Sequence, residues 1–337
     1  MSTDCRSIIR MAVAFALPLL FFLSACGGGA DRKMAKPAAK NPDGSIALPA
    51  IPANLTTTGQ RADYLALHYW DNLDFADTQL SLDTAFMEQS FVNYVTILPY
   101  ASEKSRNDAI SAILSRAARE NRNARDFLLY VAERYLYDPE SPVYNDALYK
   151  PFAAYMLTIG NSPVAHEACR EILRDIERNA PGSNAPAFSY ADRRGATRHF
   201  SPQDAPLTIL MFYDPDCEHC AEAVEYLSRS EKLRNAIYDK KLKLIAVYPG
   251  DDAALWRKHA AALPEEWEVG IDTEGRIDGE ELYQVRSTPS FYVVSSDGII
   301  QLKDQPLRTV VSVLGIWRMR LLRKKTIFAL KIALHDS

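Results

Sequence analysis

The sequence predicts two domains of different fold class: an all-α domain over residues 56–180, then an α/β domain with a mixed central sheet over residues 186–314. In the first range, apolar residues recur at the spacing of one helix face, as in Phe91, Tyr94 and Val95. In the second range, short apolar runs of strand length alternate with helical stretches. A chain of 337 residues, 47% of them hydrophobic, is long enough to form two such cores.

The charge balance gives no support for nucleic acid as the partner. The chain carries 39 Lys and Arg against 43 Asp and Glu, a formal net charge of -4 at pH 7, whereas nucleic-acid-binding domains carry a basic excess. Basic residues do gather near the C-terminus, between Arg318 and Lys325, where they are interleaved with apolar ones. Residues 315–337 are therefore interpreted as a tail that either extends the last helix with a solvated basic face or lies on anionic lipid.

Residues 1–25 are typical of a targeting segment that is removed from the mature protein. Arg6 and Arg10 precede an apolar run over residues 11–23, which is shorter than the roughly 20 residues that a helix needs to cross a bilayer. The run ends in "LSAC", which resembles the lipobox of bacterial lipoproteins. The resemblance implies cleavage before Cys26 and lipidation of that cysteine; the alternative is a plain signal peptide followed by a chance cysteine.

Lipidation would determine where the protein resides. Two or more acyl chains give stable anchoring, so we expect a protein attached to the cell envelope through Cys26. Gly27 follows the cysteine, which by analogy with enteric bacteria favours the outer membrane, on its periplasmic side. Residues 26–55 are rich in Ala, Gly, Pro, Lys and Asn without sustained periodicity, and they predict a flexible tether.

Two features of the helical domain resemble functional sites, but their residue patterns are more typical of structural roles. The cluster "HYWDNLDFAD" over residues 68–77 has a His and three Asp without regular ligand spacing, and it is typical of a helix end with its caps. Cys169 lies on the apolar face of a predicted helix, so we interpret it as a small buried hydrophobe rather than a third redox cysteine.

The α/β domain is predicted element by element from its short apolar runs and turn signals. Glycine after Arg194 favours a hairpin, and the runs that follow have the composition of strands buried on both faces. The expected elements are a hairpin over residues 187–201, strands over 207–213 and 241–250, helices around 218–238 and 252–263, two strands within 289–303, and a last helix over 305–314.

Cys217 and Cys220 lie where the first buried strand gives way to a helix. Unsatisfied N–H groups at a helix start favour a thiolate, and a spacing of three residues leaves both sulfurs within bridging reach. Cys217 is the expected attacking thiolate and Cys220 the resolving thiol. Other interpretations of the pair are a static disulfide or a copper site completed by His219 or His199. Structural zinc is disfavoured because no second C-x-x-C or H-x3-H pair completes a ligand set.

Residues 186–314 resemble a thioredoxin-fold domain of the ResA/TlpA type, a group of bacterial envelope thiol-disulfide oxidoreductases. Two motifs carry the resemblance, "CEHC" after the apolar strand and "RSTPSFYVV" over residues 286–294. The resemblance implies that Cys217 and Cys220 are the catalytic dithiol, that Pro289 is cis and faces it, and that the backbone of Thr288 pairs with the substrate chain.

The same resemblance implies the protein's partners and cofactors. The expected partners are envelope proteins that carry thiols or disulfides, together with an upstream electron donor. No metal and no cofactor beyond the dithiol is expected. The stretches "RADYLALHYWDNLDF" and "YLYDPESPVYND" are similar to an uncharacterised helical domain that is fused to thioredoxin domains in lipoproteins of the Bacteroides group. That similarity implies two domains and an anchor, but no activity for the helical part.

The sequence departs from thioredoxins around the dithiol. Asp216 stands where Trp is common, and Met211 stands where thioredoxins often place a buried carboxylate that assists proton transfer. Glu222 or Glu225 is a candidate replacement.

Asp216, Glu218 and His219 are expected to tune the redox chemistry of the pair. The two carboxylates, together with Asp214, oppose a Cys217 thiolate, while the helix terminus and a protonated His219 favour it. These effects are comparable, so the expected pKa of Cys217 is nearer that of a reducing thioredoxin than that of a strong oxidant.

Overall fold

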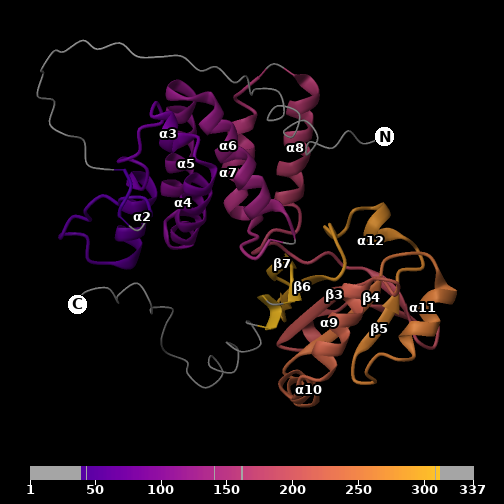
Figure 1. Ribbon diagram of the computed structural model, residues 1–337. Helices are drawn as coiled ribbons and strands as arrows, with labels where there is room; N and C mark the ends of the chain where they lie inside the picture. Colours follow the sequence, from indigo (N-terminus) through magenta and orange to yellow (C-terminus); the bar gives the residue numbers. More distant parts are fainter. Residues whose placement is uncertain (1–38, 43, 140, 161, 308, 312–337) are drawn as a thin grey trace, which may run out of the picture. The chain divides into compact units, whose positions relative to one another are not determined.

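The computed structural model describes residues 39–311, except 43, 140, 161 and 308 (Figure 1). The predicted signal peptide, Cys26, the first part of the tether and the basic tail over 315–337 lie outside the described residues. The chain divides into two compact units, Met1–Arg174 and Asp175–Ser337. Within the described residues, no helix is both long and apolar enough to cross a membrane.

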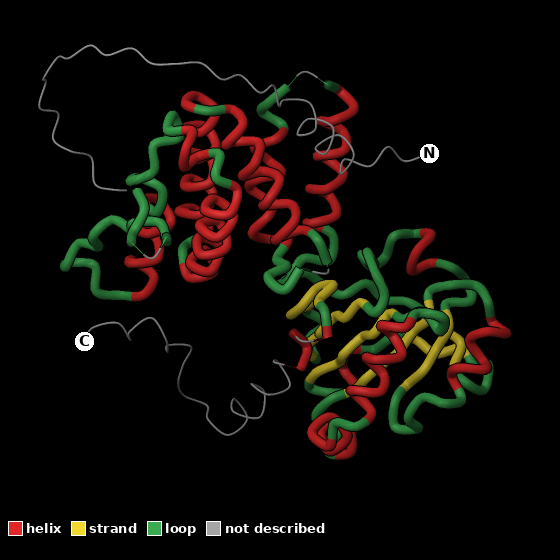
Figure 2. The backbone as a smooth tube through the Cα atoms, in the orientation of Figure 1, coloured by secondary structure: helices red, strands yellow, loops and turns green. Residues whose placement is uncertain are grey.

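The first unit is built of helices, as the sequence predicts, and the second holds the sheet (Figure 2). The helices of the first unit are α2 (Thr58–His68), α3 (Thr78–Ser81), α4 (Thr84–Ile97), α5 (Glu103–Glu120), α6 (Arg122–Ala132) and α7 (Asp146–Met156), with a 3-10 turn at Leu98–Tyr100 and a π-helical turn at Glu133–Tyr137. Helix α8 (Pro163–Glu177) contains the division between the two units.

Side-chain caps explain where these helices begin. A polar side chain at the N-cap position accepts a hydrogen bond from a backbone N–H of the first turn, which helix geometry otherwise leaves unpaired. Asp77 caps α3 in this way, while α2 ends at His68, so the cluster over residues 68–77 is the predicted helix end with its caps. The other capping residues of this kind in the first unit are Thr57, Asp83, Ser102, Asn121 and Asn145.

The second unit contains a mixed seven-stranded sheet in the order β2-β1-β5-β4-β3-β6-β7, which confirms the predicted α/β class. Strands β3, β4 and β5 are parallel, and the other pairings are antiparallel. The strands are β1 (Ser189–Asp192), β2 (Thr197–His199), β3 (Leu207–Phe212), β4 (Lys243–Tyr248), β5 (Glu268–Ile271), β6 (Ser290–Ser295) and β7 (Ile300–Gln305). The helices are α9 (Glu218–Ser228), α10 (Glu231–Tyr238), α11 (Ala253–Ala260) and α12 (Arg276–Gly279), with a 3-10 turn at Pro202–Asp204.

Strand β3 is buried at every residue because both faces of the sheet are covered. Met211 faces a core that includes Cys220 and Leu227 of α9, whereas Phe212 faces a second core of aromatic and branched residues that includes Tyr283. Because successive side chains of a strand point to opposite faces of the sheet, this one continuous apolar run contributes side chains to both cores.

The prediction needs correction at two places. The helix expected over 218–238 is two helices, because Ser230 caps a new helix start by accepting a hydrogen bond from the backbone N–H of Leu233. Strand β5 was not predicted, since its four residues include Glu268 and Gly270 and give no clear apolar run. Gln305 is the last residue of β7, and helical residues begin at Leu307, next to the expected start near Pro306.

Asn179 holds the loop that leads from α12 to β6. Its side-chain amide donates to the carbonyl of Leu282 at 2.9 Å and accepts from the backbone N–H of Gln284 at 3.0 Å. Asn179 has a φ of 53° and is 8% exposed. Asn tolerates this left-handed region better than most residues. The hydroxyl of Tyr292 donates to the carbonyl of Gln284 at 2.7 Å and holds the same loop from the sheet.

We expect Asn179→Ala to lower the free energy of unfolding by about 3 kcal/mol, from two lost hydrogen bonds and an unfavourable left-handed alanine. Asn179→Gly is the matched control, because glycine accepts this φ and loses only the hydrogen bonds, at a cost of about 2 kcal/mol. Chemical denaturation of both variants measures the difference. Equal stability of Ala and Gly variants would show that the φ of residue 179 is not a constraint.

Candidate active site

The two cysteines of the "CEHC" motif lie at the carboxyl end of the parallel strands, where open α/β sheets bind their ligands. Strand β3 ends at Phe212, and the following residues carry the chain to Cys217, which is the N-cap of α9. The Cys217 side chain makes no capping hydrogen bond to the helix in this structure. Cys220 lies in the first turn, as the sequence predicts.

The two thiols have different environments. Cys220 is 2% exposed and packs in the core beside Met211, and its sulfur accepts a hydrogen bond from the backbone N–H of Asp214 at 3.4 Å. Cys217 is half-buried. Both residues are in the thiol form. Cys217 is therefore the more accessible thiol, which matches the expected order of attack.

Thr288 is brought into direct contact with the site. The thiol of Cys217 donates to the backbone carbonyl of Thr288 across 3.3 Å, although the two residues are 71 positions apart in the sequence. The Thr288-Pro289 peptide bond is cis, in agreement with what the resemblance implied. The structure thus joins the two motifs that were singled out in the sequence.

The pKa values of the two thiols are shifted in opposite directions. Partial burial raises the pKa of Cys217, but hydrogen bonds from Cys220, the Thr288 side chain and the backbone N–H of His219 favour the thiolate and lower that pKa below the ordinary cysteine value. Burial raises the pKa of Cys220 to about 12. At neutral pH, Cys217 is consequently the thiol that ionises more readily.

The predicted tuning residues surround Cys217 but lie in solvent. Asp216 and Glu218 are exposed, and Asp216 donates its backbone N–H to the carboxylate of Asp214 at 2.9 Å. The imidazole of His219 lies 3.3 Å from the carboxylate of Glu222, and the two side chains are 70% and 68% exposed. Charges this exposed are screened by water and salt, so their influence on the thiols is weak.

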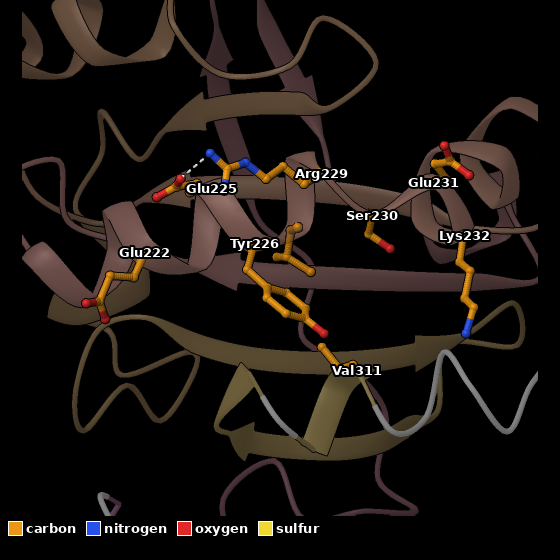
Figure 3. A pocket seen from close by; sticks show the side chains of 9 residues that line it. Glu222, Glu225, Tyr226, Arg229, Ser230, Glu231, Lys232 and Val311 are labelled. Atoms are coloured by element: carbon orange, nitrogen blue, oxygen red, sulfur yellow. Dashed lines mark ion pairs between the residues drawn. The ribbon is translucent and has the colours of Figure 1, made fainter.

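Neither Glu222 nor Glu225 takes the place of the buried acid that Met211 replaces. Glu222 and Glu225 are two and five residues beyond Cys220, which turns them about 200° and 140° around the helix from its buried side. Their carboxylates pair instead with His219 and Arg229, the latter at 2.5 Å. Figure 3 shows both glutamates on the rim of an open surface pocket of about 770 Å³ over α9 and α10. The expectation that one of them serves the dithiol is therefore not supported by their placement.

A smaller pocket, of about 260 Å³, opens beside Thr288. Its lining residues include Tyr213, Tyr248 and Tyr283, together with Asp214. Burial raises the pKa of the Tyr248 hydroxyl, and nearby carboxylates, Asp214 foremost, raise it further. Sequence analysis missed this surface because its tyrosines come from three separate segments; the available signal was that two of them stand at the ends of buried strands.

The alternative metal-binding interpretations find no ligand cluster. Within the described residues, no group of three or more His, Cys, Asp or Glu side chains could hold a metal ion. His199 is on the edge strand β2, where its imidazole lies 2.9 Å from the hydroxyl of Ser189, and three strands separate β2 from β3. Cys169 lies in α8 and is 4% exposed, which agrees with its interpretation as a small buried hydrophobe.

Comparison with known proteins identifies relatives for both parts of the chain. Residues 25–179 match the family model described as a domain of unknown function, DUF5106. The chain is 30% identical to a thioredoxin-like protein from Bacteroides caccae, over 80% of this chain and 98% of that one, with a TM-score of 0.71.

Two further structures match a smaller share of the chain. The C-terminal domain of an uncharacterized protein from Bacteroides fragilis is 31% identical, over 41% of this chain and 99% of that one, with a TM-score of 0.39. The thioredoxin domain of a thiol-disulfide oxidoreductase from Bacteroides vulgatus is 23% identical, over 40% of this chain and 98% of that one, with a TM-score of 0.35. A search of curated proteins found no match.

The difference in pKa between the Cys217 and Cys220 thiols predicts that alkylating agents react selectively with one of them. Because the pKa of Cys217 is lowered, its thiolate fraction at neutral pH exceeds that of an ordinary cysteine. We expect iodoacetamide to modify Cys217 with a rate that rises with pH as the thiolate forms, while Cys220 reacts far more slowly. Mass spectrometry of the digested, reduced protein locates the adducts. Modification of Cys220 before Cys217 would contradict the assignment.

Proposed function

This chain belongs to the thioredoxin-like protein family, and on that premise we propose that it is a thiol-disulfide oxidoreductase whose Cys217 and Cys220 exchange disulfides with other proteins. The observation that carries the proposal is the contact between the Cys217 thiol and the Thr288 carbonyl, which joins the dithiol to the loop before β6. The opposite pKa shifts of the two thiols support different roles for them, Cys217 as the attacking thiolate and Cys220 as the resolving thiol.

The exchange follows from these two environments. The Cys217 thiolate attacks one sulfur of a partner disulfide, which forms a mixed disulfide and releases the other partner sulfur as a thiolate. Cys220 then attacks the sulfur of Cys217, which forms the Cys217-Cys220 disulfide and releases the second partner thiol. The proton of Cys220 passes to a departing partner thiolate, which needs a proton once it leaves. The direction reverses when the partner is a dithiol and the pair starts oxidised.

We further propose the ResA/TlpA type for this activity, with partners among thiol- or disulfide-containing envelope proteins and an upstream electron donor that restores the dithiol. Thr288 and Pro289 would receive the partner chain beside Cys217. The position of the Thr288 backbone at the thiol is consistent with that role. The chemistry needs no cofactor beyond the dithiol, because the two sulfurs hold both electrons.

The variants of the two cysteines test the exchange activity. We expect the wild-type protein to catalyse insulin reduction by dithiothreitol, and Cys217→Ser to abolish the catalysis because no attacking thiolate remains. Cys220→Ser leaves the partner attached to Cys217, so we expect mixed disulfides that non-reducing gels resolve and that dithiothreitol releases. Cys169→Ser is the control and should behave as wild type. Equal mixed-disulfide yield from Cys217→Ser would contradict the assigned order of attack.

A redox titration and a metal analysis of the wild-type protein distinguish disulfide exchange from a static disulfide and from a copper site. A redox titration with glutathione gives a reversible two-electron transition if the pair exchanges disulfides. A pair that is reduced only on unfolding would support a binding module with a static bridge. Stoichiometric copper in the purified protein would support metal delivery.

Anchoring through Cys26 is a separate proposal, and it rests on the resemblance of residues 23–26 to a lipobox. We expect the full-length protein to partition into the membrane fraction and the detergent phase when it is expressed in a Gram-negative host. Cys26→Ala should shift it to the aqueous phase or leave an uncleaved precursor. Cys5→Ala, a change in the same leader, is the matched control. Unchanged partitioning of a Cys26 variant whose leader has been removed would exclude a lipid anchor at this residue.

A further inference from the structure

We infer that Asp304, on the neighbouring hairpin strand β7, is a positioning residue that holds the Thr288 backbone against Cys217. The inference rests on the proposed exchange activity. Asp304 is 5% exposed and is not near the cysteines in the sequence. Its carboxylate binds the chain on both sides of the Thr288-Pro289 pair, through two different residues.

The two bonds of the carboxylate are short and buried. One oxygen of Asp304 accepts from the Nε of Arg286 at 2.7 Å, and the two side chains are 3% and 10% exposed. The other oxygen accepts from the hydroxyl of Ser290 at 2.6 Å. Ser290 itself is 2% exposed. Charge-assisted bonds between buried groups are stronger and better defined in geometry than exposed ones.

The bonds from Arg286 and Ser290 enclose the segment that touches the thiol. Residue 286 lies two positions before Thr288, and residue 290 lies two positions after it. Ser290 is also the first residue of β6 and pairs with Phe212, the last residue of β3. The carboxylate of Asp304 therefore ties the loop before Thr288 to the strand after it, which leaves the Thr288 carbonyl little freedom relative to Cys217.

An irregularity in the backbone of β7 turns the Asp304 carboxylate toward the interior of the domain. Lys303 and Asp304 are both buried, although successive residues of a regular strand point to opposite faces. The pairing of β6 with β7 shifts register between Phe291 and Val293, and Asp304 has a φ of 45°, which non-glycine residues adopt only at a cost. Residues held in such conformations persist where surrounding bonds over-determine them, and they concentrate at functional sites.

Displacement of Thr288 would change the chemistry of Cys217 specifically. Hydrogen bonding from the Thr288 side chain is one of the effects that lower the pKa of Cys217, after the opposing effect of burial and the bond from Cys220. A loop that loses its hydrogen bonds to Asp304 would move Thr288, weaken the bond from its side chain to the thiolate and present the partner chain less well. A purely structural ion pair would affect stability and leave both properties unchanged.

Asp304→Asn and Asp304→Ala test the inference in the full chain. We expect the Cys217 pKa to rise by about half a unit in the Asn variant and about one unit in the Ala variant. Thiolate absorbance against pH gives the pKa without any partner protein. In insulin reduction we expect KM to rise more than kcat falls, because the loop that receives the partner chain is displaced.

Three further variants separate positioning from stability. Ser290→Ala removes one of the two ties and should give a smaller pKa rise in a well-folded protein. Arg286→Met with Asp304→Leu replaces the buried charges with apolar groups, so it keeps the fold while it removes the tie. Lys243→Met is the stability control, because it breaks ion pairs with Asp204 and Glu268 at 2.7 and 2.9 Å at the opposite end of β4 from the thiols.

The outcomes distinguish the inference from the proposed function. A raised Cys217 pKa in the Asp304 variants and the double variant, but not in Lys243→Met, supports the positioning role. An unchanged Cys217 pKa in folded Asp304→Asn and in the double variant overturns it, whatever the stability of either protein. Absence of exchange by the wild type would instead overturn the proposed function, since the thiolate titration reads the position of Thr288 independently of activity.

Discussion

The hydrogen bond from the Cys217 thiol to the Thr288 carbonyl is the interaction on which the candidate site depends. It joins the start of α9 to the loop before β6, two segments between which the chain forms α10, β4, α11, β5 and α12. Strands β3 and β6 are neighbours in the sheet, with Phe212 opposite Ser290. The register of this one antiparallel pair therefore brings the thiol and the carbonyl to the same edge.

The surroundings of that bond give the two sulfurs unequal roles without a strongly charged side chain near them. Cys220 is held neutral by burial in the core and Cys217 is favoured as an anion by hydrogen-bond donors, chiefly backbone groups and Cys220 itself. The carboxylates of Asp216, Glu218, Glu222 and Glu225 are exposed, and Met211 is apolar. In the proposed exchange, the proton of Cys220 passes to the departing partner sulfur.

Much of the fold could be predicted from the sequence because its signals are local. The hairpin around Gly195, the buried strand before Cys217 and the helix that begins there each follow from a few adjacent residues. The break at Ser230 and the short strand β5 were missed because a single cap and a four-residue run give weak local patterns.

The candidate site was predictable only in part, for a related reason. Cys217, Cys220, Thr288 and Pro289 could be predicted as site residues, because each pair lies within one contiguous sequence motif. The tyrosine-lined pocket and the tie from Asp304 depend on tertiary contacts between distant segments, and Asp304 in the sequence resembles any polar residue of an edge strand. The direction of Glu222 and Glu225 depends on the phase of α9, which only the packing of Cys220 against the core determines.

The N-cap position of Cys217 couples helix stability to sulfur chemistry. In the thiol form, no side-chain bond caps α9 at this residue, whereas the side chains of the N-cap residues Ser230 and Asp252 accept backbone N–H groups of α10 and α11. A Cys217 thiolate has the acceptor that a cap requires, and the backbone N–H groups of His219 and Cys220 are the donors that favour it. The first turn of α9 is thus best capped when the protein is reduced and ionised, and formation of a disulfide removes the anion that caps it. The helix start would then be an intrinsic reporter of the oxidation state of the pair.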